Sequence, residues 1–221
     1  MRPPEIRAEA TEYVHTVTGQ RWWRVTSICD RVLQTLAGIP PEHLEAGRAR
    51  GTYVHDAIHL INGGRDQTGL DRTSVPPAYL PYLWAFDNFA TRTKRKLLAS
   101  EEWIAHPTMP VAGTADEISE LQWKDKPTRQ IVTFVDYKTG QAAAWHAAQL
   151  SAYAESWRAR EKYRGEIRRM TVYLGADGRP SVTAWTDPLD WPSFTGFVQT
   201  YAWHARKGTL CTPRSAPPWT A

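Results

Sequence analysis

Cysteine is scarce in this sequence of 221 residues, which contains only Cys29 and Cys211. Two cysteines cannot build a disulfide framework, and they cannot supply the four ligands of a cysteine-only zinc or iron–sulfur site. The simplest interpretation is a protein from a reducing compartment. With 42% hydrophobic and 23% charged residues, the composition is that of a globular protein, and the length suits one domain with an ordinary core.

Long hydrophobic runs and a large excess of one charge are also missing. No stretch approaches the roughly 18 apolar residues that span a bilayer, and the first ten residues do not resemble a secretory signal. We therefore expect a cytoplasmic protein without a membrane partner. The 27 basic and 23 acidic residues leave a net charge of +4, which is compatible with a polyanionic partner but common among proteins that bind no nucleic acid.

The order of the predicted elements is typical of an α/β protein with one mixed sheet flanked by helices. In chain order, the patterns predict a β-hairpin (13–25), helices (26–38, 52–62 and 77–98), strands (101–106, 111–123 and 130–138), a helix (142–160), a second hairpin (168–185) and a helix (192–207). We expect a single domain, 1–221, in which the N-terminal hairpin and helices occupy 1–75, the core about 76–207 and a Pro-rich tail 208–221.

The most apolar predicted strand, 130–138, ends in Asp136-Tyr137-Lys138. Because strand side chains alternate, Asp136 and Lys138 should share one face while Tyr137 points to the other. Ligand sites in α/β sheets favour the ends of such strands. Asp136 and Lys138 could equally form an ordinary ion pair at the end of a strand, which would add little to the stability of the fold.

Asp116 lies in the preceding predicted strand. Neighbouring antiparallel strands can bring Asp116 and Asp136 to one cation, and two carboxylates that approach each other repel unless a cation neutralises them. Magnesium is commonly held by carboxylates, main-chain carbonyls and waters. Gly113 would permit a close approach to this strand, although a glycine at a β-bulge fits equally well.

His55 and His59 lie four residues apart, so they share a helix face as two zinc ligands would. No glutamate follows His55, and no cysteine partner accompanies the pair, so the zinc-protease pattern is absent. We predict that His55 is a supplementary metal ligand and that His59 is structural.

The helix predicted over 142–160 presents Gln149 and Tyr153 on one side, about one turn apart. Such residues need no function on a half-exposed face, but beside a metal site they could hydrogen-bond a phosphate or a base edge. Of the eleven tryptophans, Trp145 and Trp157 are the two whose helix face could meet DNA. The basic residues within 92–96 fit a solvated helix face or a phosphate-facing stripe.

Four segments resemble the motifs of the PD-(D/E)XK nuclease superfamily, within its RecB-like branch of phage exonucleases and nucleases of CRISPR adaptation. They are Gly51-Thr52-x-x-His55, Gly113-Thr114-Ala115-Asp116, Asp136-Tyr137-Lys138-Thr139-Gly140 and Gln149-x-x-x-Tyr153. They occur in the family's order and at familiar spacings. The resemblance implies a restriction-endonuclease-like core, with a mixed central sheet flanked by helices, after an N-terminal hairpin and helical segment.

The resemblance also implies roles for individual residues. The metal ligands would be His55, Asp116, Asp136 and the main-chain carbonyl of Tyr137. Asp116, Asp136 and Lys138 would be catalytic, with Lys138 positioning or helping to deprotonate the attacking water. Thr139, Gln149 and Tyr153 would support the site and the DNA. Glu101 and Glu102 are both candidates for an acidic residue seen in some relatives, and the sequence does not choose between them.

The implied cofactor is Mg²⁺ or Mn²⁺. Many relatives carry four cysteines for an iron–sulfur cluster, and two cysteines cannot build one, so no such cluster is expected. The expected partner is linear double-stranded or single-stranded DNA, with a recombination partner protein as a further option. No Gly-x-x-x-x-Gly-Lys-Ser/Thr loop is present, so an ATP motor within this chain is not expected.

The implied activity is metal-dependent hydrolysis of DNA phosphodiester bonds, as an exonuclease in phage or bacterial recombination and repair. Two alternatives stay open: a structure-specific endonuclease, and a catalytically silent DNA-binding or inhibitor module with the same fold. The direction of digestion, the number of metal ions and the oligomeric state are not determined by the sequence.

Overall fold

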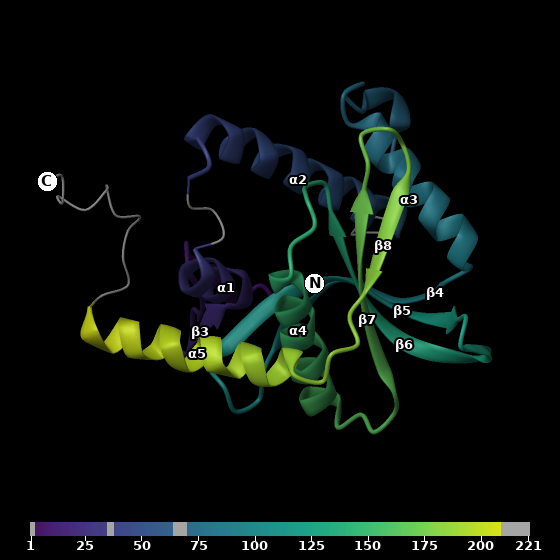
Figure 1. The fold of residues 1–221 in the computed structure, drawn as a ribbon. Helices are drawn as coiled ribbons and strands as arrows, with labels where there is room; N and C mark the ends of the chain where they lie inside the picture. Colours follow the sequence, from purple (N-terminus) through teal and green to yellow (C-terminus); the bar gives the residue numbers. More distant parts are fainter. Residues whose placement is uncertain (1–2, 35–37, 64–69, 209–221) are drawn as a thin grey trace, which may run out of the picture.

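The computed structural model describes residues 3–34, 38–63 and 70–208, and within them one mixed sheet lies between two layers of helices (Figure 1). The strands are β1 (Ile6–Ala8), β2 (Glu12–His15), β3 (Arg21–Arg24), β4 (Lys96–Ala105), β5 (Val111–Trp123), β6 (Lys126–Lys138), β7 (Ile167–Leu174) and β8 (Pro180–Ala184). The helices are α1 (Val25–Leu33), α2 (Pro41–Ile61), α3 (Leu80–Thr93), α4 (Trp145–Glu161) and α5 (Asp190–Lys207), with a short 3₁₀ helix, η1 (Arg72–Ser74). The predicted fold class, a mixed sheet flanked by helices after a hairpin, is confirmed.

Helices cover both faces of the sheet. α1, α4 and α5 pack on one face around a core that contains Phe134 and Phe194, whereas α2 and α3 pack on the other around Phe86 and Tyr137. All four of these aromatic side chains are at least 99% buried. Each large buried side chain contributes about 1.5–3 kcal/mol by leaving water, so the two cores hold the three layers together.

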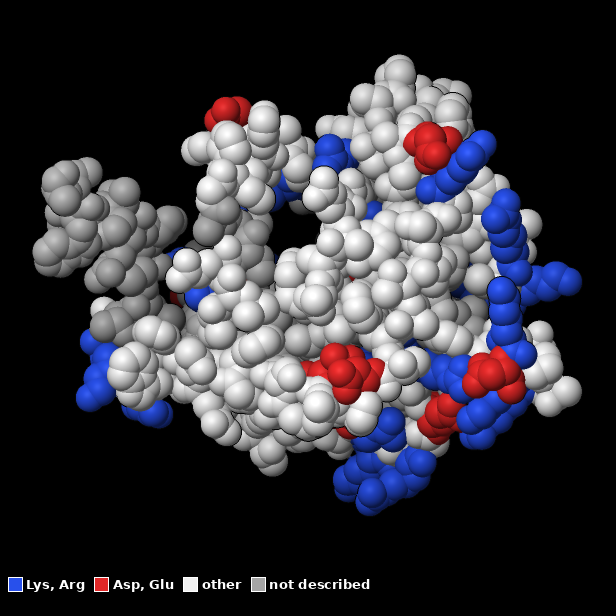
Figure 2. Space-filling model, in the orientation of Figure 1, with Lys and Arg blue, Asp and Glu red and all other residues white. Residues whose placement is uncertain are grey.

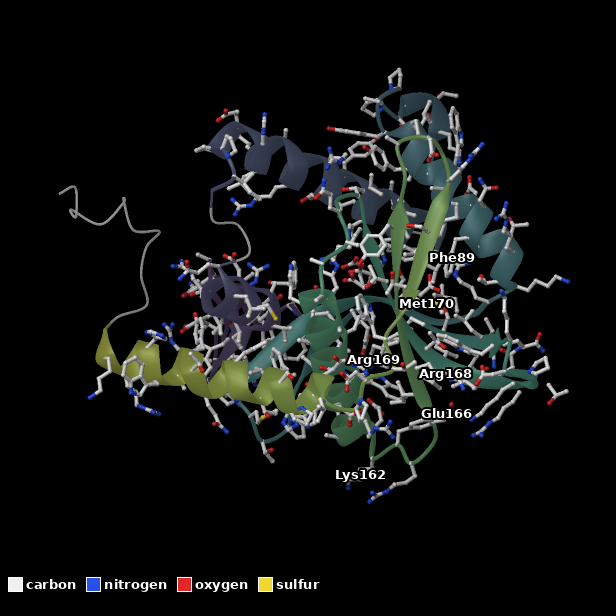
Figure 3. The ribbon with its side chains drawn as sticks, viewed as in Figure 1. Phe89, Lys162, Glu166, Arg168, Arg169 and Met170 are labelled. Carbon is white, nitrogen blue, oxygen red and sulfur yellow. The ribbon has the colours of Figure 1, made fainter. Side chains whose placement is uncertain are left out.

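The alternation along β7 shows how one strand serves both layers (Figure 3). Met170 belongs to the same core cluster as Phe89 of α3. Its neighbour Arg169 points to the opposite layer, where it lies 2.9 Å from Asp190 of α5 and donates to the carbonyl of Ala147 in α4. Successive side chains of a strand point to opposite faces, so one short segment fastens helices on both sides.

The sheet has a gap beside the middle of β5. One edge of β5 pairs with β4 from Ala112 to Glu120. On the other edge, β6 pairs with residues 117–123 and β3 pairs in parallel with residues 111–112. Residues 113–116 therefore have a strand partner on the β4 side alone, and the C-terminal end of β6 borders the gap.

Two of the predicted helices have the wrong boundaries. The predicted start at Thr52 does not exist, because α2 is continuous through Gly47 and Gly51. An interior glycine costs a helix about 1 kcal/mol relative to alanine, and burial of Ala57 and Ile58 in the core offsets this cost. The helix predicted over 77–98 ends at Thr93, and the chain then turns into β4.

Smaller differences concern the ends of elements. α1 begins directly after Arg24 without a side-chain cap, so Thr26 and Ser27 lie inside the helix, and it ends at Leu33. β1 was not predicted, and β6 begins at Lys126 rather than at residue 130. Residues 64–69 and residues 209–221 of the Pro-rich tail, with Cys211, lie outside the described residues.

Figure 2 shows Lys and Arg side chains along one margin of the molecule, near the ends of β5 and β6, with acidic side chains among them. Among the interactions there are ion pairs of Lys96 with Glu120 (2.9 Å), Lys126 with Glu166 (2.6 Å) and Arg168 with Asp125 (2.6 Å). The expected helix face within 92–96 does not form, because α3 ends at Thr93, and Lys96 is paired with Glu120. Within the described residues, no helix combines the length and the apolar character needed to cross a membrane.

Candidate metal centre

Three side chains of ligand type converge at the gap in the sheet. His55 comes from α2, Glu101 from β4 and Asp116 from β5, and one ligand atom of each lies within 4.8 Å of the other two. His55 Nδ1 lies 3.4 Å from Asp116 Oδ1 and 3.8 Å from Glu101 Oε1. An imidazole nitrogen with carboxylate oxygens is a donor set for divalent metal ions, so this cluster can hold one.

Glu101 is the residue that the sequence could not select. Its neighbour Glu102 forms an ion pair with Arg160 at 2.7 Å, whereas Glu101 faces the cluster. The register of β4 with β5 places Glu101 opposite Asp116, since the residues on either side of it pair with Glu117 and Ala115. Glu101 also has a φ of 53° inside a strand, an uncommon value for a residue other than glycine that costs of order 1–3 kcal/mol.

Asp136 and Lys138 form a second group beside this cluster. Lys138 Nζ lies 2.7 Å from Asp136 Oδ1, which confirms that the two share a face, and Gln149 Nε2 donates to the same oxygen at 3.3 Å. Asp136 is not one of the three clustered ligands. Its Oδ2 and the Oε1 of Gln149 are buried acceptors without a hydrogen-bond partner among the described residues. Buried acceptors are normally paired, and two oxygens without a donor fit a bound cation.

Tyr137 connects the two groups through its main chain. The pairing of β5 with β6 ends at Glu117 and Val135, so Tyr137 lies beyond the β5–β6 ladder. The main-chain N–H of Tyr137 donates to Asp116 Oδ2 at 2.7 Å instead. The middle of β5 and the C-terminal end of β6, which are antiparallel neighbours, thus carry the two carboxylates.

The charges in this region are tightly balanced. Burial lowers the pKa of His55, but the attraction of Asp116 and hydrogen bonds to Asp116 and Glu101 outweigh it and raise the pKa to about 10. Burial raises the pKa of Asp136 to about 6, helped by the nearby Asp116 charge and opposed by Lys138. Both shifts favour the protonated forms of His55 and Asp136. A divalent cation can take the place of these protons.

Tyr153 packs directly on Gly113. A Cβ atom at Gly113 would lie 2.4 Å from Cε1 of Tyr153, and no register shift of β5 occurs there, so the glycine serves close approach rather than a bulge. Gln149 Nε2 donates to the Tyr153 hydroxyl at 3.3 Å, and both side chains are at least 96% buried. The pair therefore contacts the site from inside the protein.

Replacing Gly113 by alanine should lower the free energy of unfolding by about 1–3 kcal/mol, because the new methyl group displaces the Tyr153 ring. Urea unfolding measures this change. Gly196→Ala in α5 is the matched control, since a Cβ there meets nothing within 4 Å. Equal stabilities for the two variants would contradict the packing role of Gly113.

The remaining predicted residues also have defined contacts. Thr139 Oγ1 accepts a hydrogen bond from Arg50 Nε at 3.2 Å, which ties α2 to the turn after β6. His59 Nδ1 lies 3.0 Å from Ser100 Oγ, a contact that fits the structural role predicted for His59. Trp157 is half-buried against Phe134 and Tyr163 at 5.8 and 5.3 Å between ring centroids, and it is part of the core.

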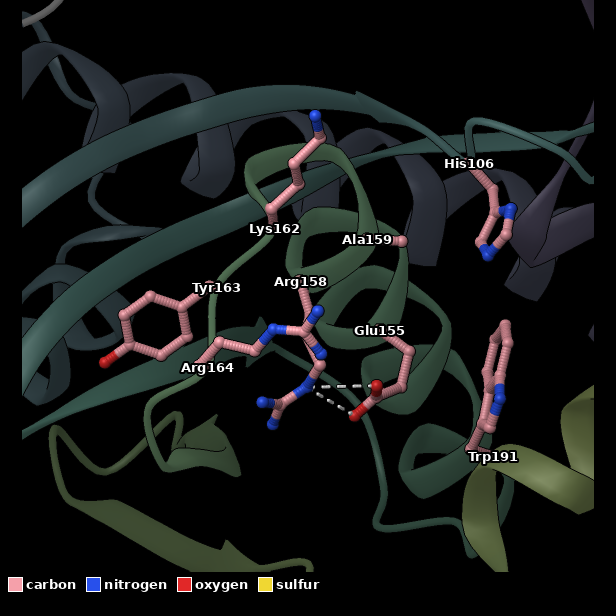
Figure 4. A pocket seen from close by; sticks show the side chains of 8 residues that line it. All are labelled: His106, Glu155, Arg158, Ala159, Lys162, Tyr163, Arg164 and Trp191. Atoms are coloured by element: carbon pink, nitrogen blue, oxygen red, sulfur yellow. Dashed lines mark hydrogen bonds and ion pairs between the residues drawn. The ribbon is translucent and has the colours of Figure 1, made fainter.

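Two cavities differ in their relation to the site. One of about 400 Å³ is lined by Thr139, the residue that follows Lys138, together with Tyr82, Tyr173 and Arg179. The other, of about 280 Å³, lies at the C-terminal end of α4 and contains none of the site residues (Figure 4). There Arg158 already pairs with Glu155 at 3.1 Å. The first cavity therefore lies at the turn after β6, and none of the three clustered ligands lines it.

Comparisons with known proteins yield distant structural likenesses. No family model and no curated protein matches the chain. An alkaline exonuclease, LHK-Exo from Laribacter hongkongensis, is similar over 85% of this chain and 89% of its own, with 10% identity and a TM-score of 0.43. LHK-Exo in complex with dAMP is similar over 82% and 88%, with 11% identity and a TM-score of 0.42. SSO0001 is similar over 81% and 74%, with 14% identity and a TM-score of 0.36. At such values none of them assigns a function, which has to come from the site itself.

Proposed function

We propose that this protein is a metal-dependent deoxyribonuclease that hydrolyses phosphodiester bonds, acting as an exonuclease on linear DNA. The observation that carries the proposal is the convergence of His55, Glu101 and Asp116 beside the Asp136–Lys138 pair. A cluster of carboxylates with one ammonium group suits hydrolysis of a phosphodiester, which requires stabilisation of negative charge and an activated water.

The residues divide into metal ligands and groups that act on the substrate. The proposed ligands of Mg²⁺ or Mn²⁺ are His55, Asp116, Asp136 and the main-chain carbonyl of Tyr137, and Glu101 adds a carboxylate. When bound, the ion stabilises charge on the scissile phosphate and lowers the pKa of a coordinated water.

Lys138 is the group that faces both the ligands and the substrate. Burial lowers the pKa of Lys138, but the Asp136 and Asp116 carboxylates outweigh this effect and raise it. Lys138 therefore carries its proton when no metal is bound. Its ammonium can add positive charge at the phosphate or orient the attacking water. Gln149 holds Asp136 in place through a hydrogen bond to Oδ1.

The proposal is tested by comparing the cleavage of linear DNA with that of closed circular DNA in the presence of Mg²⁺, Mn²⁺ or EDTA. The linear DNA is labelled at one end and then, in a second substrate, at the other. We expect linear DNA to be digested only with a divalent ion, while circular DNA persists. Cleavage of circular DNA would favour the structure-specific endonuclease. Ion-independent binding without cleavage would favour the silent module, and a wild type that is inert with every ion would overturn the proposal.

A metal ion should also stabilise the fold, because it neutralises clustered carboxylates in the native state alone. At a Mn²⁺ concentration of about 100 times the dissociation constant, the expected gain is about 2.7 kcal/mol. Thermal unfolding with and without Mn²⁺ measures this. The Glu101→Gln variant should need a higher Mn²⁺ concentration for the same gain, and an identical Mn²⁺ response of variant and wild type would remove Glu101 from the ligand set.

A further inference from the structure

Glu117 is a fully buried carboxylate that the proposed chemistry does not use. It follows Asp116 in β5 and is 0% exposed. Arg95 Nε donates to Oε1 of Glu117 at 2.7 Å, and the Tyr137 hydroxyl donates to Oε2 at 2.8 Å. Ser119 Oγ also donates to Oε1. A buried charge is costly unless it is paired and hydrogen-bonded, and here both carboxylate oxygens are satisfied.

The partners of Glu117 belong to the elements that carry the metal centre. Tyr137 contributes its hydroxyl to Glu117 and its main-chain N–H to Asp116, so a single residue spans the sheet between the two carboxylates. The Tyr137 ring is fixed from the side by Phe86 and Phe89 of α3, with centroid separations of 5.4 and 6.1 Å.

Asn62 connects Glu117 with the helix that carries His55. It is the C-terminal cap of α2 and lies seven residues after His55, which places both on one helix face. Its Oδ1 accepts from Arg95 Nη2 at 2.6 Å, and its Nδ2 donates to Glu117 Oε2 at 3.4 Å. Between the two, His59 contacts Ser100 of β4. The face of α2 is thus held against β4 and β5 at three successive positions.

We infer that Glu117 is a positioning residue for the metal centre. By fixing Tyr137 and the end of α2, Glu117 sets the affinity of the centre for its ion. The inference rests on the proposed function. Asp116, His55 and the Tyr137 main chain come from three different elements, and Glu117 and its partners bind all three elements to one another. Groups that orient metal ligands without touching the metal typically change metal affinity or activity by about 10- to 100-fold when they are removed.

Tyr137→Phe and Glu117→Gln test the inference, since the first removes one hydrogen bond and the second removes the charge paired with Arg95, both with little change in volume. We expect Mn²⁺ binding, measured by calorimetry, to weaken by about 10- to 100-fold in both variants. We also expect kcat to fall while KM for DNA changes little, because no DNA contact is removed. The double variant should lose little beyond the larger of the two single effects, because both changes break one network.

Asp190→Asn is the matched control, because it removes the partner of Arg169 in an ion pair between α5 and β7. This variant should melt at a lower temperature yet bind Mn²⁺ within about twofold of wild type, as expected for independent sites. Folded Tyr137→Phe and Glu117→Gln that bind Mn²⁺ as wild type does would overturn the inference. If Glu117→Gln does not fold, Tyr137→Phe and Asn62→Ala decide by the same criterion. A wild type that neither binds Mn²⁺ nor cleaves DNA would instead refute the proposed function.

Discussion

Replacing Asp116 by asparagine is expected to lower the rate of DNA cleavage by about 10³-fold or more. Asp116 is the residue that joins the two halves of the site, since it contacts His55 and accepts the Tyr137 main-chain N–H. Its amide counterpart keeps the volume but loses the negative charge that holds a divalent ion. A loss of this size corresponds to about 4 kcal/mol of transition-state stabilisation, within the range that a metal ion contributes to hydrolysis.

Steady-state digestion of end-labelled linear DNA measures this effect, with thermal unfolding to show that the variant is folded. Asp56→Asn is the control, because Asp56 is exposed, neighbours His55 and loses the same charge. We expect Asp56→Asn to cleave DNA at the wild-type rate. An Asp116→Asn variant that is folded and as active as wild type would remove this carboxylate from the mechanism.

Lys138→Met should reduce cleavage by about 10²- to 10³-fold while leaving Mn²⁺ binding intact. The ammonium lies 2.7 Å from Asp136 Oδ1 and is 21% exposed, so it can reach both a ligand of the metal and the substrate. Removing a donor aimed at charge that develops in the transition state typically has an effect of this size. Mn²⁺ affinity should not fall, because the lost charge is positive and repels the ion.

Lys138→Arg separates the two roles of this residue. Arginine keeps the positive charge but stays protonated, so partial activity in this variant would favour charge stabilisation, and complete loss would favour proton transfer or strict geometry. Lys124→Met, in the exposed turn between β5 and β6, is the charge-matched control and should be fully active. Weakened Mn²⁺ binding by folded Lys138→Met would contradict the proposed division of roles.

The order and type of most elements could be predicted because local signals determine them. The continuous apolar run of β6 and the hairpin expected over 13–25 were visible in the sequence. The end of α3 was not, because Leu97 and Leu98 fit the periodicity of the helix as well as that of β4. The continuity of α2 through Gly51 depends on burial against α3 and the sheet, which tertiary packing provides.

Only some of the residues of the candidate site could be placed from the sequence. Alternation placed Asp136 and Lys138 together, and helical spacing placed Gln149 beside Tyr153. Glu101 could not be chosen over Glu102, because the choice depends on the register of β4 with β5 and on a left-handed φ at Glu101. The role inferred for Glu117 depends on contacts with Asn62 and Arg95, which are 55 and 22 positions away in the sequence.

The sequence by itself determined the class of fold, the residue types available for chemistry and the face of its own element on which each one lies. These properties follow from periods of two and 3.6 residues, which act within a single strand or helix. The tertiary structure alone decided which faces meet: the gap beside residues 113–116, the approach of α2 to β5, and the close contact of Tyr153 with Gly113. Such contacts arise between segments far apart in the chain, where packing and strand register, rather than local propensity, set the distances.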